Sequence, residues 1–253
     1  MDLSLIMTLS RYRHALSALM ALSVIGCSQG LRNMAELSSA AFSTPESVLL
    51  TRDEILALDY AANYFQLEGN PRSVVPLNQA NDQQLSWRVG AYQFVHTQAG
   101  RVVASDALPD MPLQTSERDR DPLLCIQNLN RLPLGSGCPS QWQRRIVWKS
   151  HQGEHTELQH SWVRSTVTRA AQPGPITLLN GSEFSAYRID EQGQWLAVSS
   201  TAAPQPFENT FWQDADSGRI IKARQFLSPR LGYLLSEELV PFQAPAVDAD
   251  ETP

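Results

Sequence analysis

The chain has 253 residues, of which 42% are hydrophobic and 18% are charged, and its formal net charge is −6. This composition excludes a disordered chain, because such chains contain fewer apolar residues and more charge. The acidic charge argues against nucleic acid as the main partner, since nucleic-acid-binding proteins present basic surfaces. The long apolar run lies at the N-terminus, so a protein with several membrane spans is also excluded.

The first 26 residues are predicted to be a secretion signal. Arg11 and Arg13 form a basic flank, and residues 15–25 form an uninterrupted run of small and apolar side chains. A membrane-spanning helix needs about 20 apolar residues, so this run is too short to span. Met7 can start translation as well as the first residue, because the segment before it adds nothing that a signal needs.

The signal ends in a sequence that resembles the bacterial lipobox, Val24-Ile25-Gly26-Cys27. In such sequences the peptidase cuts after a small residue, and the cysteine thiol carries diacylglycerol. We therefore expect Cys27 to carry acyl chains such as palmitate and to anchor the mature protein stably, since two or more chains suffice for that. An ordinary signal peptide with a chance cysteine is the alternative. Ser28 in place of Asp favours the outer membrane, facing the periplasm, under enterobacterial-type sorting.

Two further cysteines remain in the mature chain, Cys125 and Cys138. An even pair in an oxidising compartment predicts a disulfide, and two free thiols are the alternative. The bond would close a loop of about 14 residues, which is worth about 3 kcal/mol on the chain-entropy model. Neither a third cysteine nor a nearby histidine offers zinc geometry, so no metal or other cofactor is expected.

The mature chain divides into a tether over residues 27–47, a β domain over 48–242 and a disordered acidic tail over 243–253. Strand-like segments in the β domain alternate with Gly-, Asn- and Asp-rich turns. This pattern predicts one all-β domain, an antiparallel meander that forms a barrel-like sheet or a two-sheet sandwich. The predicted strands are 60–67, 73–77, 85–96 (broken by Gly90), 101–105, 142–150, 155–168, 181–189, 194–200, 207–213, 219–227 and 234–240.

Three segments between the strands are predicted to be turns: residues 98–100, 191–193 and 216–218. Residues 51–63 have a helical tendency and are either a short helix or the entry to the first strand.

Three short motifs are candidates for catalytic or metal sites. His151-Gln-Gly-Glu154-His155 matches the H-x-x-E-H pattern of zinc peptidases, but Gly153 and strand-like flanks favour a hairpin turn. The charged segment 116–121 is interpreted as a solvated loop rather than an acid–base pair. Residues 135–137, Gly-Ser-Gly, lack the strand–turn–helix setting of a nucleophile elbow. No catalytic residue is therefore expected, and the protein is predicted not to be an enzyme.

Tryptophans are the most distinctive side chains of the predicted strands. Burial in the core is the favoured interpretation for each, and stacking on sugar rings is the alternative. Trp142 and Trp148 share a strand face with Arg144 and Ile146, so that face is interpreted as mixed rather than as a core face. The six tryptophans are Trp87, Trp142, Trp148, Trp162, Trp195 and Trp212.

Together, several blocks of sequence resemble one known family. The most specific is Asn209-Thr-Phe-Trp-Gln-Asp214, followed by Ser217-Gly218 and Arg224-Gln225-Phe226-Leu227. The others are the lipobox cysteine, Tyr60-Ala-Ala-Asn-Tyr64, Trp87, Gly100-Arg101-Val102, Asp121-Pro122-Leu123, and Trp142 with Arg145-Ile146-Val147-Trp148. In order and spacing the chain resembles the YjbF/GfcB-type lipoproteins, or group 4 capsule polysaccharide lipoproteins, from about residue 59 to residue 242.

The resemblance implies a β protein that is anchored in the outer membrane, faces the periplasm and is encoded with capsule or exopolysaccharide export machinery. It implies no catalytic residues. We therefore expect a non-enzymatic accessory factor that binds an export protein or the polysaccharide itself. An envelope hydrolase with an unrecognised site and a generic structural lipoprotein are the alternatives. The segment 110–140 and the acidic tail depart from the family pattern.

Overall fold

The computed structural model describes residues 46–81, 84–129, 137–152, 155–197 and 203–243. The predicted signal peptide and Cys27 lie outside these residues, and so does most of the predicted tether and of the acidic tail. None of the helices in the described part has the length and apolar character needed to cross a bilayer.

The described chain begins with a short helix, α3 (Arg52–Leu56). Thr51 caps it, because its hydroxyl accepts a hydrogen bond from the Glu54 N–H while the Glu54 carboxylate accepts one from the Thr51 N–H. Of the two interpretations of residues 51–63, the short helix is confirmed for their first half, and the second half leads into the first strand.

Thirteen strands follow in the described residues, and all their pairings are antiparallel. Their bounds are β1 (Ala62–Leu67), β2 (Ser73–Asn81), β3 (Gln84–Arg88), β4 (Phe94–Gln98), β5 (Arg101–Asp106), β6 (Pro112–Thr115), β7 (Gln141–Gln152), β8 (His155–Arg169), β9 (Gly174–Thr177), β10 (Glu183–Ala197), β11 (Gln205–Asp214), β12 (Ile220–Ser228) and β13 (Gly232–Val240).

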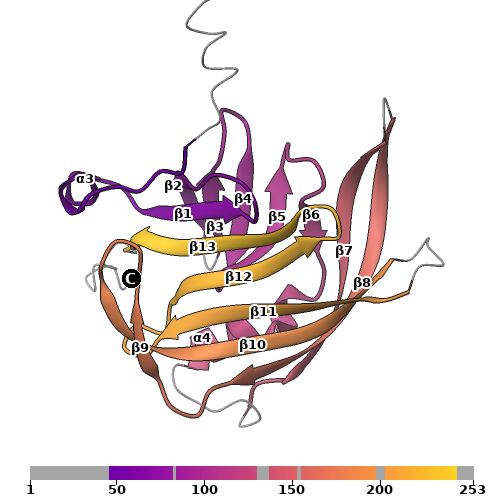
Figure 1. Ribbon diagram of the computed structural model, residues 1–253. Coiled ribbons are helices and arrows are strands. Elements are labelled where there is room, and N and C mark those ends of the chain that lie inside the picture. Colours follow the sequence, from indigo (N-terminus) through magenta and orange to yellow (C-terminus); the bar gives the residue numbers. More distant parts are fainter. Residues whose placement is uncertain (1–45, 82–83, 130–136, 153–154, 198–202, 244–253) are drawn as a thin grey trace, which may run out of the picture. The chain divides into compact units, whose positions relative to one another are not determined.

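The strands form one sheet in the order β5-β4-β3-β2-β1-β13-β12-β11-β10-β8-β7-β6, with β9 added beside β10. The sheet curls into a nearly closed barrel, so that its two end strands approach each other (Figure 1). There the Ser105 hydroxyl of β5 donates a hydrogen bond to the Pro112 carbonyl of β6, at 2.8 Å. The predicted all-β antiparallel meander is confirmed, in its barrel-like form.

A second helix, α4 (Pro122–Leu129), packs against the inner face of the sheet. Leu123 and Ile126 are almost fully buried there against Val167, Ile189 and Phe211. The helix was not predicted, because its eight residues are too few to show a helical period. The structure places a disulfide between Cys125 of α4 and Cys138, with the two Cα atoms 5.6 Å apart.

The prediction of a turn at residues 191–193 is wrong. They lie inside β10, which runs unbroken between β8 and β11. Gly193 is needed there because a Cβ at its position would lie 2.4 Å from the ring of Phe207. The glycine that suggested a turn therefore makes room for an aromatic ring inside the barrel.

Gly193→Ala is expected to lower the free energy of unfolding by about 1–3 kcal/mol, because the added methyl overpacks the site beside Phe207. Gly174→Ala is the matched control, since a Cβ on this strand glycine would meet nothing within 4 Å. Urea unfolding of the two variants measures the difference. Equal unfolding midpoints would show that Gly193 has no packing role.

Candidate functional site

The interior of the barrel contains a network of buried charges. Arg101 in β5 donates to the Asp121 carboxylate from Nε at 2.6 Å and to the Glu191 carboxylate from Nη1 at 2.6 Å. All three side chains are at most 4% exposed. One guanidinium therefore ties the segment that precedes α4 to the middle of β10.

Glu191 is the centre of this network. Its Oε1 accepts hydrogen bonds from Arg144 Nη1 at 3.0 Å and from the Ser165 hydroxyl at 2.6 Å. Its Oε2 accepts from Asn209 Nδ2 at 2.7 Å, besides the bond from Arg101. Strands β5, β7, β8, β10 and β11 thus converge on one carboxylate.

Trp142 lies beside both arginines of the network. The guanidinium carbons of Arg144 and Arg101 lie 4.1 Å and 4.8 Å from the centre of its ring. Both contacts are cation–π interactions, which are stronger where water is excluded. The indole Nε1 donates to the backbone carbonyl of Glu117, at 2.9 Å. The Trp142 ring therefore stabilises both guanidinium groups and also fixes the position of the loop before α4.

Two positive and two negative charges balance in the network, so their burial leaves no net charge inside the barrel. Burial alone would raise the pKa of Glu191, but the positive charges of Arg101 and Arg144 outweigh it and hold that pKa well below 4.5. Burial lowers the pKa of Arg144 to about 10, despite the opposing effect of Glu191. Burial lowers the pKa of Arg101, but the negative charges of Asp121 and Glu191 raise it by more, so Arg101 stays charged.

Residues from separate blocks of the family resemblance meet at this network. Gln225 adds a backbone link, since its Oε1 accepts from the Val102 N–H at 2.9 Å and its Nε2 donates to the Gly100 carbonyl at 3.2 Å. The blocks that resemble the family therefore share a physical role in the barrel interior. The residues that meet here from those blocks are Arg101, Asp121, Trp142, Asn209 and Gln225.

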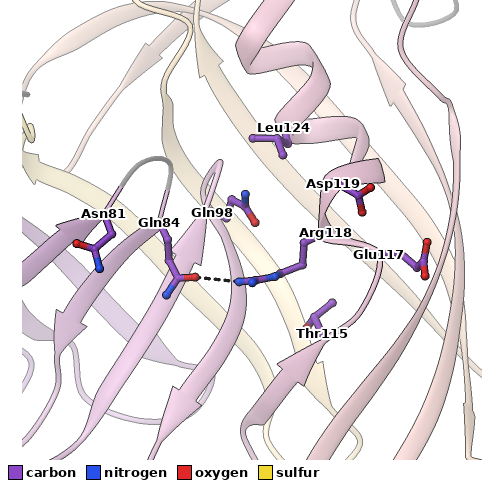
Figure 2. A pocket seen from close by; sticks show the side chains of 8 residues that line it. All are labelled: Asn81, Gln84, Gln98, Thr115, Glu117, Arg118, Asp119 and Leu124. Atoms are coloured by element: carbon purple, nitrogen blue, oxygen red, sulfur yellow. Dashed lines mark hydrogen bonds between the residues drawn. The ribbon is translucent and has the colours of Figure 1, made fainter.

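A polar pocket of about 630 Å³ lies next to the loop that the network holds (Figure 2). It lies between the ends of β2, β3 and β4 on one side and the 3₁₀ turn η1 (Arg118–Arg120) on the other. Arg118 reaches across it and donates from Nη1 to the Gln84 carboxamide oxygen, at 2.8 Å. Its lining residues are Asn81, Gln84, Gln98, Thr115, Glu117, Arg118, Asp119 and Leu124.

The buried network holds the η1 wall of this pocket at both ends. Trp142 donates to the carbonyl of Glu117, and Arg101 binds Asp121, the residue that follows η1. Asp121 also accepts from the Leu123 N–H at 2.9 Å, which satisfies a free donor in the first turn of α4. The η1 wall of the pocket is therefore held in place by contacts with the buried network.

A second cavity, of about 320 Å³, is lined mostly by apolar side chains such as Phe65, Val95 and Met111. It offers few hydrogen-bonding groups, so the polar pocket is the better candidate for specific recognition.

The motifs that the sequence offers as catalytic sites are only partly covered by the described residues. His151 and His155 lie on the paired strands β7 and β8, so they cannot share a helical face as a zinc peptidase requires. Residues 153 and 154 and residues 135 and 136 lie outside the described residues. In the part of the chain that is described, no three His, Cys, Asp or Glu side chains are grouped to hold a metal ion.

The interpretation of residues 116–121 as a solvated loop is wrong at its last residue. Arg118 and Asp119 are exposed, but Asp121 is 3% exposed and is paired with Arg101. A carboxylate next to alternating charges is exposed by default. The burial of Asp121 is favourable because Arg101 and the Leu123 N–H both donate to its carboxylate.

The tryptophans follow the favoured core interpretation with two exceptions. Trp162 is 41% exposed on the outer face of β8, and Trp212 is half-buried. The shared face of β7 proves to be a core face, because Arg144 and Ile146 are buried on it and Arg144 is ion-paired. The other four tryptophans, Trp87, Trp142, Trp148 and Trp195, are buried.

Sequence reasoning missed Glu191, the centre of the network. A signal was present, since Ile189 and Trp195 have the same parity along β10 and are both buried. If residues 189–195 are taken as one continuous strand, side chains alternate between its two faces, and Glu191 falls on the same inward face. This pattern predicts a charged side chain inside the barrel.

Glu191→Gln is expected to lower the free energy of unfolding by about 3–5 kcal/mol, because it leaves two buried guanidinium groups with one carboxylate. Glu68→Gln is the control, since Glu68 is 57% exposed in its ion pair with Arg224 and such pairs contribute about 0–1 kcal/mol. Urea unfolding at neutral pH measures both. A loss for Glu191→Gln no larger than for the control would contradict a central role.

The lowered pKa of Glu191 also predicts an acid dependence of stability. As the pH falls below 4.5, the unfolded chain takes up a proton at this residue while the folded chain does not, so the stabilisation by Glu191 is progressively lost. Urea midpoints between about pH 5 and about pH 3 should therefore fall more steeply for the wild type than for Glu191→Gln. Parallel curves would show that Glu191 is not ionised in a stabilising network.

The fold is shared with a solved structure. The crystal structure of the hypothetical lipoprotein YmcC from Escherichia coli K12 matches with a TM-score of 0.61 at 21% sequence identity, over 78% of this chain and 91% of that one.

The chain is also similar in sequence to known lipoproteins and to a family model. The lipoprotein GfcB of Escherichia coli K12 is 26% identical over 85% of this chain and 92% of its own length. The lipoprotein YjbF of the same strain is 29% identical over 76% of this chain and 80% of its own. The model of the family described as group 4 capsule polysaccharide lipoprotein GfcB, YjbF matches residues 35–239. The resemblance found in the sequence is thereby confirmed, and the chain belongs to the family of GfcB- and YjbF-type group 4 capsule polysaccharide lipoproteins.

Proposed function

We propose that this lipoprotein is a non-enzymatic accessory factor in the production or export of capsule or exopolysaccharide. Cys27 would be lipidated and would anchor the protein in the outer membrane, facing the periplasm. The barrel would act by binding a protein of the export system or the polysaccharide. The observation that carries this proposal is the family match over residues 35–239, together with the lipobox that ends at Cys27.

The chemistry of the barrel interior favours binding over catalysis. Glu191 and Asp121 are closely placed carboxylates, as many glycosidases use, but both are buried and ion-paired with Arg101. A general acid needs a raised pKa, whereas the pKa of Glu191 is lowered. The buried carboxylates therefore support the fold and the pocket wall.

An envelope hydrolase is the second candidate, because two other carboxylates, those of Glu117 and Asp119, line the polar pocket. Release of reducing ends from the strain's own polysaccharide by purified protein distinguishes the two functions. Turnover that is lost in Glu117→Gln or Asp119→Asn would establish the hydrolase and overturn the accessory role.

Deletion of the gene in the producing bacterium is expected to reduce the amount, the length or the surface attachment of the polysaccharide. Cys27→Ala should reproduce the deletion and abolish labelling of the protein by a palmitate analogue, because the acyl acceptor is lost. Ser28→Ala is the matched control and should keep both label and polysaccharide. A deletion strain with unchanged polysaccharide would contradict the proposed function.

A further inference from the structure

We propose that the polar pocket between the β2–β4 strand ends and η1 binds an uncharged sugar segment of the polysaccharide. This inference rests on the proposed function and names the ligand class of the same site. The pocket volume of about 630 Å³ lies within the range of about 300–1,000 Å³ that is usual for small-molecule sites.

The hydrogen-bonding groups of the pocket suit sugar hydroxyls. Asn81, Gln84 and Gln98 are carboxamides, which carry both donors and an acceptor. Asn81 Oδ1 already accepts from Gln79 Nε2 at 3.1 Å, so Asn81 offers its amide nitrogen. Arg118 binds the oxygen of Gln84, so the Gln84 amide nitrogen can donate toward a ligand. Within the described residues, the carboxamide of Gln98 has no partner of its own. Hydroxyl groups, which both donate and accept, complement such a set.

The charges of the pocket favour a neutral ligand. Arg118 supplies one positive charge and Asp119 one negative charge. The second carboxylate, Glu117, is ion-paired with Arg120 at 3.5 Å, so the charges around the pocket balance. A charged chain therefore gains no net electrostatic attraction here, whereas a neutral ligand needs none. Leu124 adds an apolar surface on which the C–H face of a sugar ring can lie.

Thr115, another lining residue of the pocket, supports the same conclusion. It is 4% exposed, and among the described residues its Oγ1 has no hydrogen-bond partner. The fold thus contains a buried polar atom whose requirement a hydroxylated ligand can meet.

The test is an NMR titration of the ¹⁵N-labelled mature chain, carrying Cys27→Ser so that it stays unlipidated. Tetrasaccharides of glucose, galactose, mannose and N-acetylglucosamine are the neutral probes, and tetragalacturonate is the acidic probe. At least one neutral probe is expected to shift the side-chain amide signals of Gln84 and Gln98 in a saturable way. The amide signal of Gln143, on the outer face of β7, should not move.

Gln98→Met removes the hydrogen-bonding group while keeping the length of the side chain. It should weaken binding at least tenfold without changing the unfolding midpoint, because the Gln98 side chain has no partner within the described residues. Gln143→Met is the matched control and should bind like the wild type.

Three outcomes would overturn the inference. They are the absence of saturable shifts with every neutral probe, binding of tetragalacturonate alone, and undiminished binding by Gln98→Met. If one of them occurs while the deletion strain still loses its polysaccharide, the pocket assignment fails and the proposed function stands. If the deletion strain is unaffected, the proposed function itself fails.

Discussion

The carboxylate of Glu191 is the point on which the barrel interior depends. It accepts hydrogen bonds from Arg101, Arg144, Ser165 and Asn209, which come from four other strands. A buried charge is stable only when hydrogen-bond and ion-pair partners surround it. The strands around Glu191 therefore pair in the one register that brings these partners to its carboxylate. A shift of β10 by one residue would turn Glu191 outward and leave both guanidinium groups unpaired.

This constraint extends from the interior to the surface. Arg101 binds Asp121 and Trp142 binds the carbonyl of Glu117, so the network holds both ends of η1. The η1 turn forms one wall of the polar pocket, and its opposite wall belongs to strand ends of the same sheet. The shape of the pocket is therefore coupled to the stability of the core.

Most of the strand framework was predictable, because alternating side chains and Gly-, Asn- and Asp-rich turns are local signals. Four parts were not, and one of them is the four-residue strand β9 (Gly174–Thr177). Helix α4 is too short for a helical period, and β6 (Pro112–Thr115) has only four residues. Gly193 was interpreted as part of a turn, although its role is to leave space for Phe207 from the neighbouring strand. Its correct interpretation required knowledge of that strand.

The sequence by itself determined the all-β class and the family, since these rest on local pattern and on order along the chain. It also predicts an export signal that ends at the acceptor cysteine Cys27. Only the tertiary structure decided which charges are buried and where a ligand can bind. Arg101 and Glu191 are 90 residues apart in the chain, and Gln84 and Arg118 are 34 apart. Such pairs form when the sheet curls, because strand pairing brings together residues whose separation carries no local signal.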